Sequence, residues 1–276
     1  MLRWLRYDCM AREITDGIYL IQECNDRMSL TEQYQENPPD WYVDGKTVHS
    51  SQSAYLFVGE ETLLFDTLSP AAREHVLTEV DEVLDGRSLD YLVVSHPEAP
   101  HAGNAQELCE AHPEATLIAP DYGNTHDLYY LDDATQVAPG TVLEVGEFEL
   151  EVIDPVFVDH KMHIWLFDRT TETLFTVDWL GLMHMEGECL TLADELDEPV
   201  ARHRLELFHG RALFWFEYAD LAKVDAAIED LIETYDPAVL APAHGFVVRE
   251  DTAGYMRNMK SVVRSIAEER AVSEAW

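Results

Sequence analysis

The sequence predicts an α/β domain in which two β layers lie between outer helices, a four-layer αββα sandwich. Strand-like apolar segments alternate with amphipathic helical segments in both halves of the 276 residues. This order, strands and helices followed by strands and helices again, favours two sheets packed face to face with helices outside. No repeat or low-complexity linker interrupts the chain, so we expect one domain over residues 1–276.

The first half of the chain is mostly β. The expected strands are Gly17–Gln22, Ser53–Val58, Thr62–Phe65, Leu89–Val94 and Thr116–Ala119. Helical spacing of apolar residues predicts helices over Ala71–Leu84 and Gly103–Ala111. The segment Leu89–Val94 is of particular interest because it ends directly at Ser95-His96.

The second half returns to β after a loop over Asp121–Ala138 and then becomes more helical. The expected strands are Thr141–Val145, Phe148–Ile153, Ile164–Phe167, Thr173–Val177 and Ala238–Ala241. The expected helices are Ala219–Tyr235 and Thr252–Glu269.

The charge of the chain is strongly acidic. Eighteen Lys and Arg face 54 Asp and Glu, a formal net charge of -36. Such a chain repels itself unless salt screens the charges, so we expect a halophilic protein with a solvated acidic surface. Nucleic acid is excluded as an expected partner, because phosphate binding needs clustered basic residues.

The cysteines and the apolar segments indicate a cytoplasmic protein. Cys9, Cys24, Cys109 and Cys189 show no CxxC spacing, so we expect reduced thiols. The N-terminal segment lacks the features of a signal peptide, and no apolar run reaches the roughly 18 residues that a membrane helix needs.

A metal site is predicted from three segments that each follow an apolar strand. Residues 95–104, SHPEAPHAGN, place His96, Glu98 and His101 within a short loop. LFTVD ends at Asp178, and LAPAHG ends a strand at His244. Imidazole and carboxylate donors suit zinc, iron or manganese, and one carboxylate can bridge two cations.

The order of these segments resembles the metallo-β-lactamase superfamily: Asp66 in LLFDT, the His-x-Glu-x-x-His-x-Gly-Asn segment, Asp178 and His244. Glu98 stands where the superfamily usually has a second histidine. A glutamate at this position resembles the flavodiiron branch, whose motif is His-x-Glu-x-Asp-His. The resemblance extends from about Glu13 to Val248.

The resemblance implies a pair of iron ions. His96 and Glu98 would hold the first metal, His101 and His244 the second, and Asp178 would bridge them. Asp66 would fix the ligand loop by hydrogen bonds rather than bind metal. Zinc or manganese, as one ion or two, is the alternative.

Two positions depart from the family pattern. Pro100 stands where the family has a loop aspartate, so the second metal would lose a ligand. The family's middle histidine falls at Asp159, about 19 residues before Asp178. We favour His160 as the ligand there, with Asp159 and then His163 as the alternatives.

Other histidines are expected to be less important. His184 lies six residues after Asp178, near where the flavodiiron branch has a pocket histidine, and is expected to contact substrate or donate a proton. A surface position explains it equally well. His209 is expected to be solvated or at a helix end.

Three functions follow from these residues. The first is a non-haem diiron oxidoreductase, with Asp178 and His184 in the reactive site, that binds or reduces oxygen, nitric oxide or peroxide. Its electrons would come from a separate flavodoxin-like or rubredoxin-like donor, and the family's homodimer is an open expectation. The second is a zinc-dependent hydrolase, and the third is a degenerate sensing domain without turnover.

Overall fold

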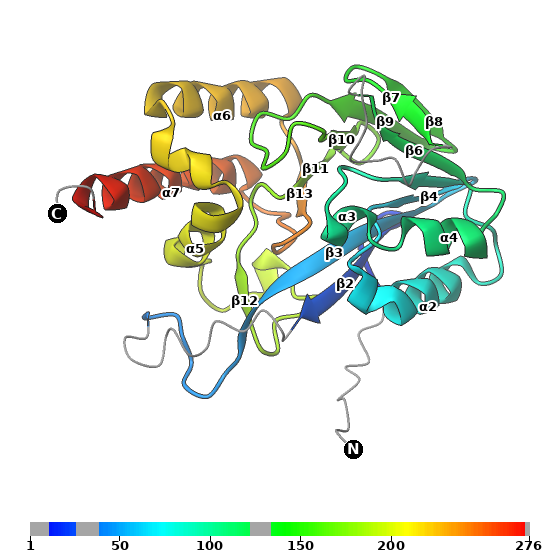
Figure 1. Ribbon diagram of the computed structural model, residues 1–276, viewed down its shortest axis with the longest axis horizontal. Helices are drawn as coiled ribbons and strands as arrows, with labels where there is room; N and C mark the ends of the chain where they lie inside the picture. The colour runs from blue at the N-terminus through cyan, green and yellow to red at the C-terminus, as the bar shows by residue number, and fades with distance from the viewer. Residues whose placement is uncertain (1–10, 26–38, 122–133, 274–276) are drawn as a thin grey trace.

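The computed structural model describes residues 11–25, 39–121 and 134–273. Two β-sheets pack against each other, and helices cover their outer faces, with α2 and α4 on one side of the molecule and α5, α6 and α7 on the other (Figure 1). This arrangement confirms the predicted layers.

The larger sheet contains eight strands. Seven follow the order β1-β2-β3-β4-β5-β6-β7, and β12 pairs with the free part of β3. Their bounds are β1 (Arg12–Thr15), β2 (Ile18–Asn25), β3 (Val48–Val58), β4 (Thr62–Phe65), β5 (Tyr91–Val93), β6 (Thr116–Pro120), β7 (Thr135–Val137) and β12 (Met183–Met185). The strands β1 to β4 are antiparallel neighbours, whereas β4, β5, β6 and β7 are parallel.

The smaller sheet has the order β13-β11-β10-β9-β8. Its strands are β8 (Val142–Val145), β9 (Phe148–Ile153), β10 (Trp165–Asp168), β11 (Thr173–Val177) and β13 (Val239–Pro242). Only β11 and β13 run parallel among these strands.

Side-chain alternation along the strands builds two cores. Phe57 and Phe65 point between the sheets and contact Phe175 of the smaller sheet, with ring centroids 5.3 and 5.9 Å apart. Leu56 and Leu64 point to the opposite face and pack under α2 and α4. Both faces of the central strands are therefore buried, which explains their near-continuous apolar sequence.

The helices flank these cores, and several begin close to the predicted residues. They are α2 (Arg73–Leu84), α3 (Ala99–Ala102), α4 (Ala105–Ala111), α5 (Arg202–Ala212), α6 (Leu221–Tyr235) and α7 (Thr252–Ser273). Helix α6 begins after Asp220, whose carboxylate accepts a hydrogen bond from the Ala222 amide. Among the described residues, no helix is long and apolar enough to cross a membrane.

Some elements were not predicted. No apolar pattern in the sequence marks helix α5, strand β12 or the polar start of β3. Strand β7 falls within the segment Asp121–Ala138, which was expected to be a loop. Residues 122–133 of that loop lie outside the described part. The polar start of β3 is buried because β2 and β12 pair with it on both sides.

The expectation of reduced cysteines was wrong for one pair. Cys24, near the end of β2, forms a disulfide with Cys189, while Cys109 is free. The partners are 165 residues apart, and they meet because the chain after β12 returns to the end of β2. Sequence spacing carries no signal of such a contact.

Candidate metal centre

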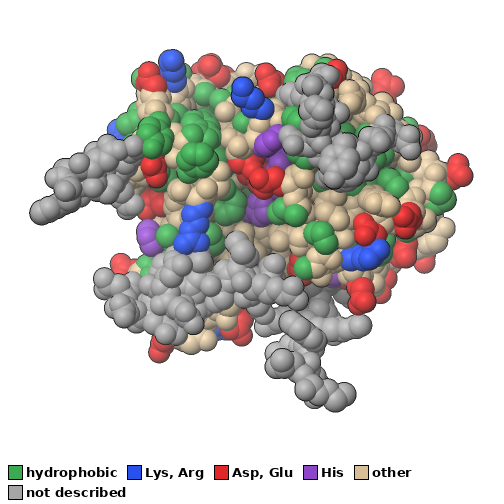
Figure 2. Space-filling view, viewed as in Figure 1, with side chains coloured by type: hydrophobic (Ala, Val, Ile, Leu, Met, Phe, Trp, Pro, Cys, Tyr) green, Lys and Arg blue, Asp and Glu red, His purple; other side chains and the backbone are tan. Residues whose placement is uncertain are grey.

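The candidate ligands come from the ends of two pairs of parallel strands. Strands β4 and β5 lead to Asp66 and His96, and strands β11 and β13 lead to Asp178 and His244. Because neighbouring parallel strands end at the same edge of a sheet, each pair delivers its side chains together. The two sheets thus bring these residues to one place, and histidine and acidic side chains gather near the middle of the face in Figure 2.

Asp178 stands at the centre and its two oxygens face different histidines. Oδ1 lies 3.4 Å from His101 Nε2 and 3.2 Å from His244 Nε2. Oδ2 lies 3.6 Å from His96 Nε2 and 3.8 Å from His163 Nδ1. The carboxylate therefore belongs to two groups of donor atoms, one on each side.

We name these groups by their residues. The anchored half consists of His101, His244 and Asp178 Oδ1, and the loop half consists of His96, Asp159, His163 and Asp178 Oδ2. Within each, one donor atom from every residue lies within 4.8 Å of the others. Together with the protein's mixed nitrogen and oxygen donors, this spacing fits iron, zinc or manganese.

The distances favour metal ligation over direct hydrogen bonding. Donors held at about 2.1 Å from one ion lie roughly 3.0–3.5 Å apart. His96 Nε2 and Asp178 Oδ2 are buried and have no hydrogen-bond partner among the described residues. Buried polar atoms are costly to leave unpaired, so their convergence indicates that a cation fits between them.

The anchored half is fixed by hydrogen bonds on the far side of each imidazole. His101 Nδ1 donates to Asp66 Oδ2 at 2.7 Å, and His244 Nδ1 donates to the Ser51 carbonyl at 2.6 Å. Each bond leaves Nε2 directed at Asp178. A carboxylate or carbonyl behind a histidine fixes the ring and its tautomer, so Asp66 has the predicted hydrogen-bonding position.

Asp66 also fixes the loop that carries His96. Its carboxylate accepts hydrogen bonds from the Ser95 amide (2.8 Å) and hydroxyl (3.0 Å). The Ser95 hydroxyl in turn accepts from His96 Nδ1 at 3.1 Å, which leaves His96 Nε2 facing the cluster. Asn104 supports the same loop, because its amide donates to the carbonyls of Thr67, Leu68 and Ser69.

Burial and neighbouring charges set the protonation of these groups. Burial, together with His101 and His163, lowers the pKa of His96 well below its usual value. For His101, burial is opposed by Asp66 and Asp178, which raise its pKa to about 10. For Asp178, burial is overcome by His101 and His96, which hold its pKa well below the ordinary value. A cation would replace the proton that His101 otherwise retains.

The loop half differs from the favoured expectation. His160 is in neither group, and its Nδ1 accepts a hydrogen bond from the Met162 amide at 3.0 Å. Asp159 and His163 lie there instead, with Asp159 Oδ2 3.8 Å from His96 Nε2. The Ile164 amide donates to the Ser95 carbonyl, which places His163 flat against His96 with ring centroids 4.2 Å apart.

Glu98 lies at the exposed edge of the loop half. It is hydrogen-bonded to Asp159, and partial burial followed by Asp159 and Asp178 raises the pKa of its carboxyl. It is outside the two groups whose donors lie within 4.8 Å of one another. Pro100 lies in the short helix α3 and offers no side-chain donor.

Two histidines flank the centre. His184 is buried on β12, stacks on Phe246 and lies 3.3 Å from the Ser51 hydroxyl. It is therefore not on the surface, and Ser51 links it to His244 through the Ser51 carbonyl. His209 lies in the last turn of α5, at a helix end as expected, but it is buried and not solvated. It accepts from the Leu180 amide and donates to the Leu205 carbonyl, and burial lowers its pKa to about 4.

His209 supports a strained turn that sequence reasoning missed. Val177 and Leu180, on either side of Asp178, have φ of 51° and 70°. Such values are unfavourable for large or β-branched side chains and cluster at functional sites. A histidine in the last turn of a helix with few apolar residues gave no signal of this contact.

The chain is similar to known proteins in sequence and in fold. Residues 48–182 match the family model described as "Metallo-beta-lactamase superfamily". Over these 135 of its 276 residues, the chain is similar to a metallo-β-lactamase domain. This domain holds Asp66, the His96–His101 loop, Asp159, His163 and Asp178, whereas His244 lies beyond the matched residues.

The chain is also similar to curated redox proteins. The chain is 27% identical over 244 residues to a nitric oxide reductase of Moorella thermoacetica and 25% identical over 251 residues to a rubredoxin-oxygen oxidoreductase of Megalodesulfovibrio gigas. These matches cover 86% and 87% of this chain but only 57% of either relative. The chain thus spans less than two thirds of the length of these relatives.

Solved structures show the same fold. The rubredoxin:oxygen oxidoreductase of Desulfovibrio gigas has a TM-score of 0.71 at 21% identity, covering 94% of this chain and 61% of that one. The flavodiiron protein of Giardia intestinalis has a TM-score of 0.73 at 19% identity, covering 93% and 60%. Similarity of this kind supports the metallo-β-lactamase fold.

Proposed function

We propose that this metallo-β-lactamase domain is a non-haem diiron protein that binds or reduces oxygen or nitric oxide with electrons from a separate donor. The observation that carries the proposal is the placement of Asp178, whose two oxygens face the anchored half and the loop half. The names of the relatives, a nitric oxide reductase and a rubredoxin-oxygen oxidoreductase, support the substrate class.

The proposed ligands are His101, His244 and Asp178 in the anchored half, and His96, Asp159, His163 and Asp178 in the loop half. Glu98 would join the loop half from its exposed edge. Two irons would supply redox electrons to a bound diatomic molecule.

The chain's own residues would orient the site and manage its protons. Asp66 and the Ser51 carbonyl orient His101 and His244, so little rearrangement is needed on binding a cation. Glu98, whose pKa is raised, would release its proton when it joins a cation in the loop half. His184 is buried behind Ser51, so we assign it to positioning and not to direct contact with substrate.

The electron donor is proposed from the relatives. A rubredoxin-like or flavin-bearing protein would have to approach the face on which the histidine and acidic side chains gather (Figure 2). The acidic charge of the chain, -36, means that this approach would be strongly dependent on salt.

The test is reconstitution of the full chain with ferrous iron under anaerobic conditions in high salt. Reduced rubredoxin is then added with nitric oxide or oxygen, and gas consumption is followed with an electrode. We expect rubredoxin-dependent consumption by the iron-loaded protein and none by the zinc-loaded protein. Ester or phosphodiester hydrolysis by the zinc form, without gas consumption by the iron form, would instead support a hydrolase.

A further inference from the structure

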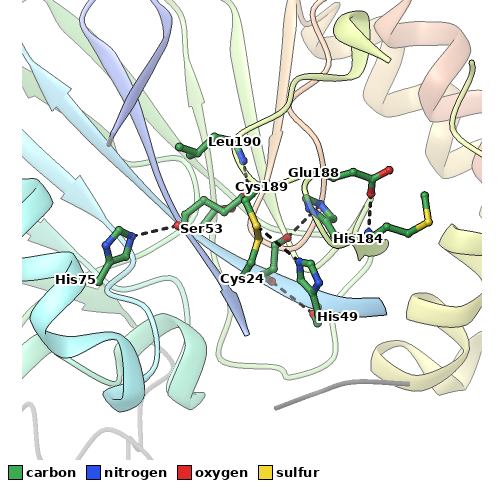
Figure 3. Close-up of a disulfide and its surroundings, with 12 residues drawn as sticks. Cys24, His49, Ser53, His75, His184, Glu188, Cys189 and Leu190 are labelled. Carbon is green, nitrogen blue, oxygen red and sulfur yellow. Dashed lines mark hydrogen bonds between the residues drawn. A yellow bond between two sulfur atoms is a disulfide. The ribbon is translucent and has the colours of Figure 1, made fainter. Parts of the chain in front are cut away.

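A second cluster of metal-binding side chains lies apart from the Asp178 centre. Cys24 and Cys189, joined as a disulfide, lie beside His49, as Figure 3 shows. The three residues each offer a donor atom within 4.8 Å of the others. We propose that Cys24, Cys189 and His49 bind a soft divalent cation such as Zn²⁺ when the disulfide is reduced.

The donor types and their distances carry the first part of the argument. His49 Nε2 lies 3.8 Å from Cys189 Sγ. In a tetrahedral zinc site with Zn–S of about 2.3 Å and Zn–N of about 2.0 Å, a nitrogen and a sulfur ligand lie roughly 3.6 Å apart. The His49 imidazole is therefore already at about the distance from Cys189 Sγ that two ligands of one zinc ion have. The two sulfurs must move apart, after reduction, before both can bind the same ion.

Hydrogen bonds from two side chains hold the segments of Cys24 and Cys189 together independently of the disulfide. The Leu190 amide, next to Cys189, donates to Gln22 Oε1 at 2.7 Å, and Gln22 lies on β2 two residues before Cys24. Arg12 Nη1 donates to the Leu190 carbonyl at 2.7 Å. These contacts keep the thiols close after reduction, so the site would be preorganised.

The strand pairing holds His49 in the same place. On β3, His49 pairs with His184 of β12, and Ser51 pairs with Cys24 of β2. His49 is buried, whereas both cysteines are partly exposed. A cation would therefore have protein ligands on its inner side and an open position toward solvent for water, as zinc sites with three protein ligands have.

The chemistry separates this cluster from the Asp178 centre. Thiolates favour soft cations such as Zn²⁺, whereas the Asp178 centre has only nitrogen and oxygen donors. Reduction by a water-soluble phosphine takes up one water, breaks the sulfur–sulfur bond, and yields two thiols and the phosphine oxide. Binding of the cation then displaces the two thiol protons.

Cobalt titration provides the test, because thiolate-to-cobalt charge transfer reports sulfur ligands only. The full chain is reduced with a phosphine, desalted without oxygen and titrated with Co²⁺. We expect a near-ultraviolet charge-transfer absorption that is lost in Cys24→Ser and in Cys189→Ser and is displaced by Zn²⁺. It should be weaker in His49→Ala and unchanged in Cys109→Ser, the control at a free cysteine within the described residues.

A second measurement uses only the unaltered chain, so it does not depend on folding of the variants. Zn²⁺ should slow alkylation of Cys24 and Cys189 by about tenfold or more, as mapped by peptide mass spectrometry, and should leave Cys109 unaffected. The proposal is overturned if the reduced chain gives no charge-transfer absorption. It is also overturned if the absorption survives in both serine variants, or if Zn²⁺ gives Cys24 and Cys189 no protection.

Discussion

The two halves of the candidate metal centre are built in different ways. In the anchored half, His101 and His244 each donate a hydrogen bond to a fixed acceptor, Asp66 Oδ2 and the Ser51 carbonyl. In the loop half, His96 and the shared Asp178 follow strands, while Asp159 and His163 come from the irregular segment between β9 and β10. The anchored half is therefore held by hydrogen bonds to fixed acceptors, whereas two ligands of the loop half come from an irregular segment.

This difference bears on how tightly each half would hold an ion. A ligand whose orientation is fixed before binding loses little conformational freedom when the ion arrives. We therefore expect the anchored half to load first, and the loop half to load with help from Glu98 at its edge.

The largest expected effect is that of Asp178→Ala, because Asp178 is the one residue shared by both halves. This change should reduce bound iron from about two ions per chain to nearly none. Elemental analysis of the reconstituted protein measures it, and circular dichroism checks the fold. Retention of both ions by a folded variant would contradict a bridging role.

The next effect separates His163 from His160. His163→Ala should remove about one ion per chain, because it deletes a donor of the loop half. His160→Ala is the matched control and should leave the metal content unchanged, since His160 faces the Met162 amide. Loss of an ion from His160→Ala, with none lost from His163→Ala, would instead support His160 as the ligand.

A smaller effect is expected for Asp66→Asn, which keeps all the proposed ligands. Loss of the charged partner of His101 should weaken the anchored half about 10–100-fold in metal affinity. Asp81→Asn, at a carboxylate whose side chain is 71% exposed, removes the same charge without this contact. Competition with a chelator gives both affinities, and equal values would show that Asp66 has no such role.

The smallest expected effect concerns Gly245, next to His244. A Cβ there would lie 2.7 Å from the Leu180 carbonyl oxygen, so Gly245→Ala should destabilise the fold by about 1–3 kcal/mol. Gly210→Ala, in α5 with open space around it, should stabilise by up to about 1 kcal/mol. Urea unfolding in high salt compares the two, and equal midpoints would mean that the His244 turn can relax.

The same contrast explains what could be predicted from the sequence. His96, Asp178 and His244 each follow a buried apolar strand, so the strand pattern of the sequence was sufficient to predict their positions. The loop before His163 has no such pattern, so choosing His160 over its neighbours rested on spacing alone. His209 and the Cys24–Cys189 contact depend on packing between distant segments, which no local pattern reveals.

The most direct test of the central claim is a crystal structure of the iron-loaded chain with anomalous scattering recorded at the iron edge. The account predicts two anomalous peaks, one beside Asp178 Oδ1 with His101 and His244, and one beside Oδ2 with His96, Asp159 and His163. A single peak, or two peaks of which neither contacts Asp178, would contradict it.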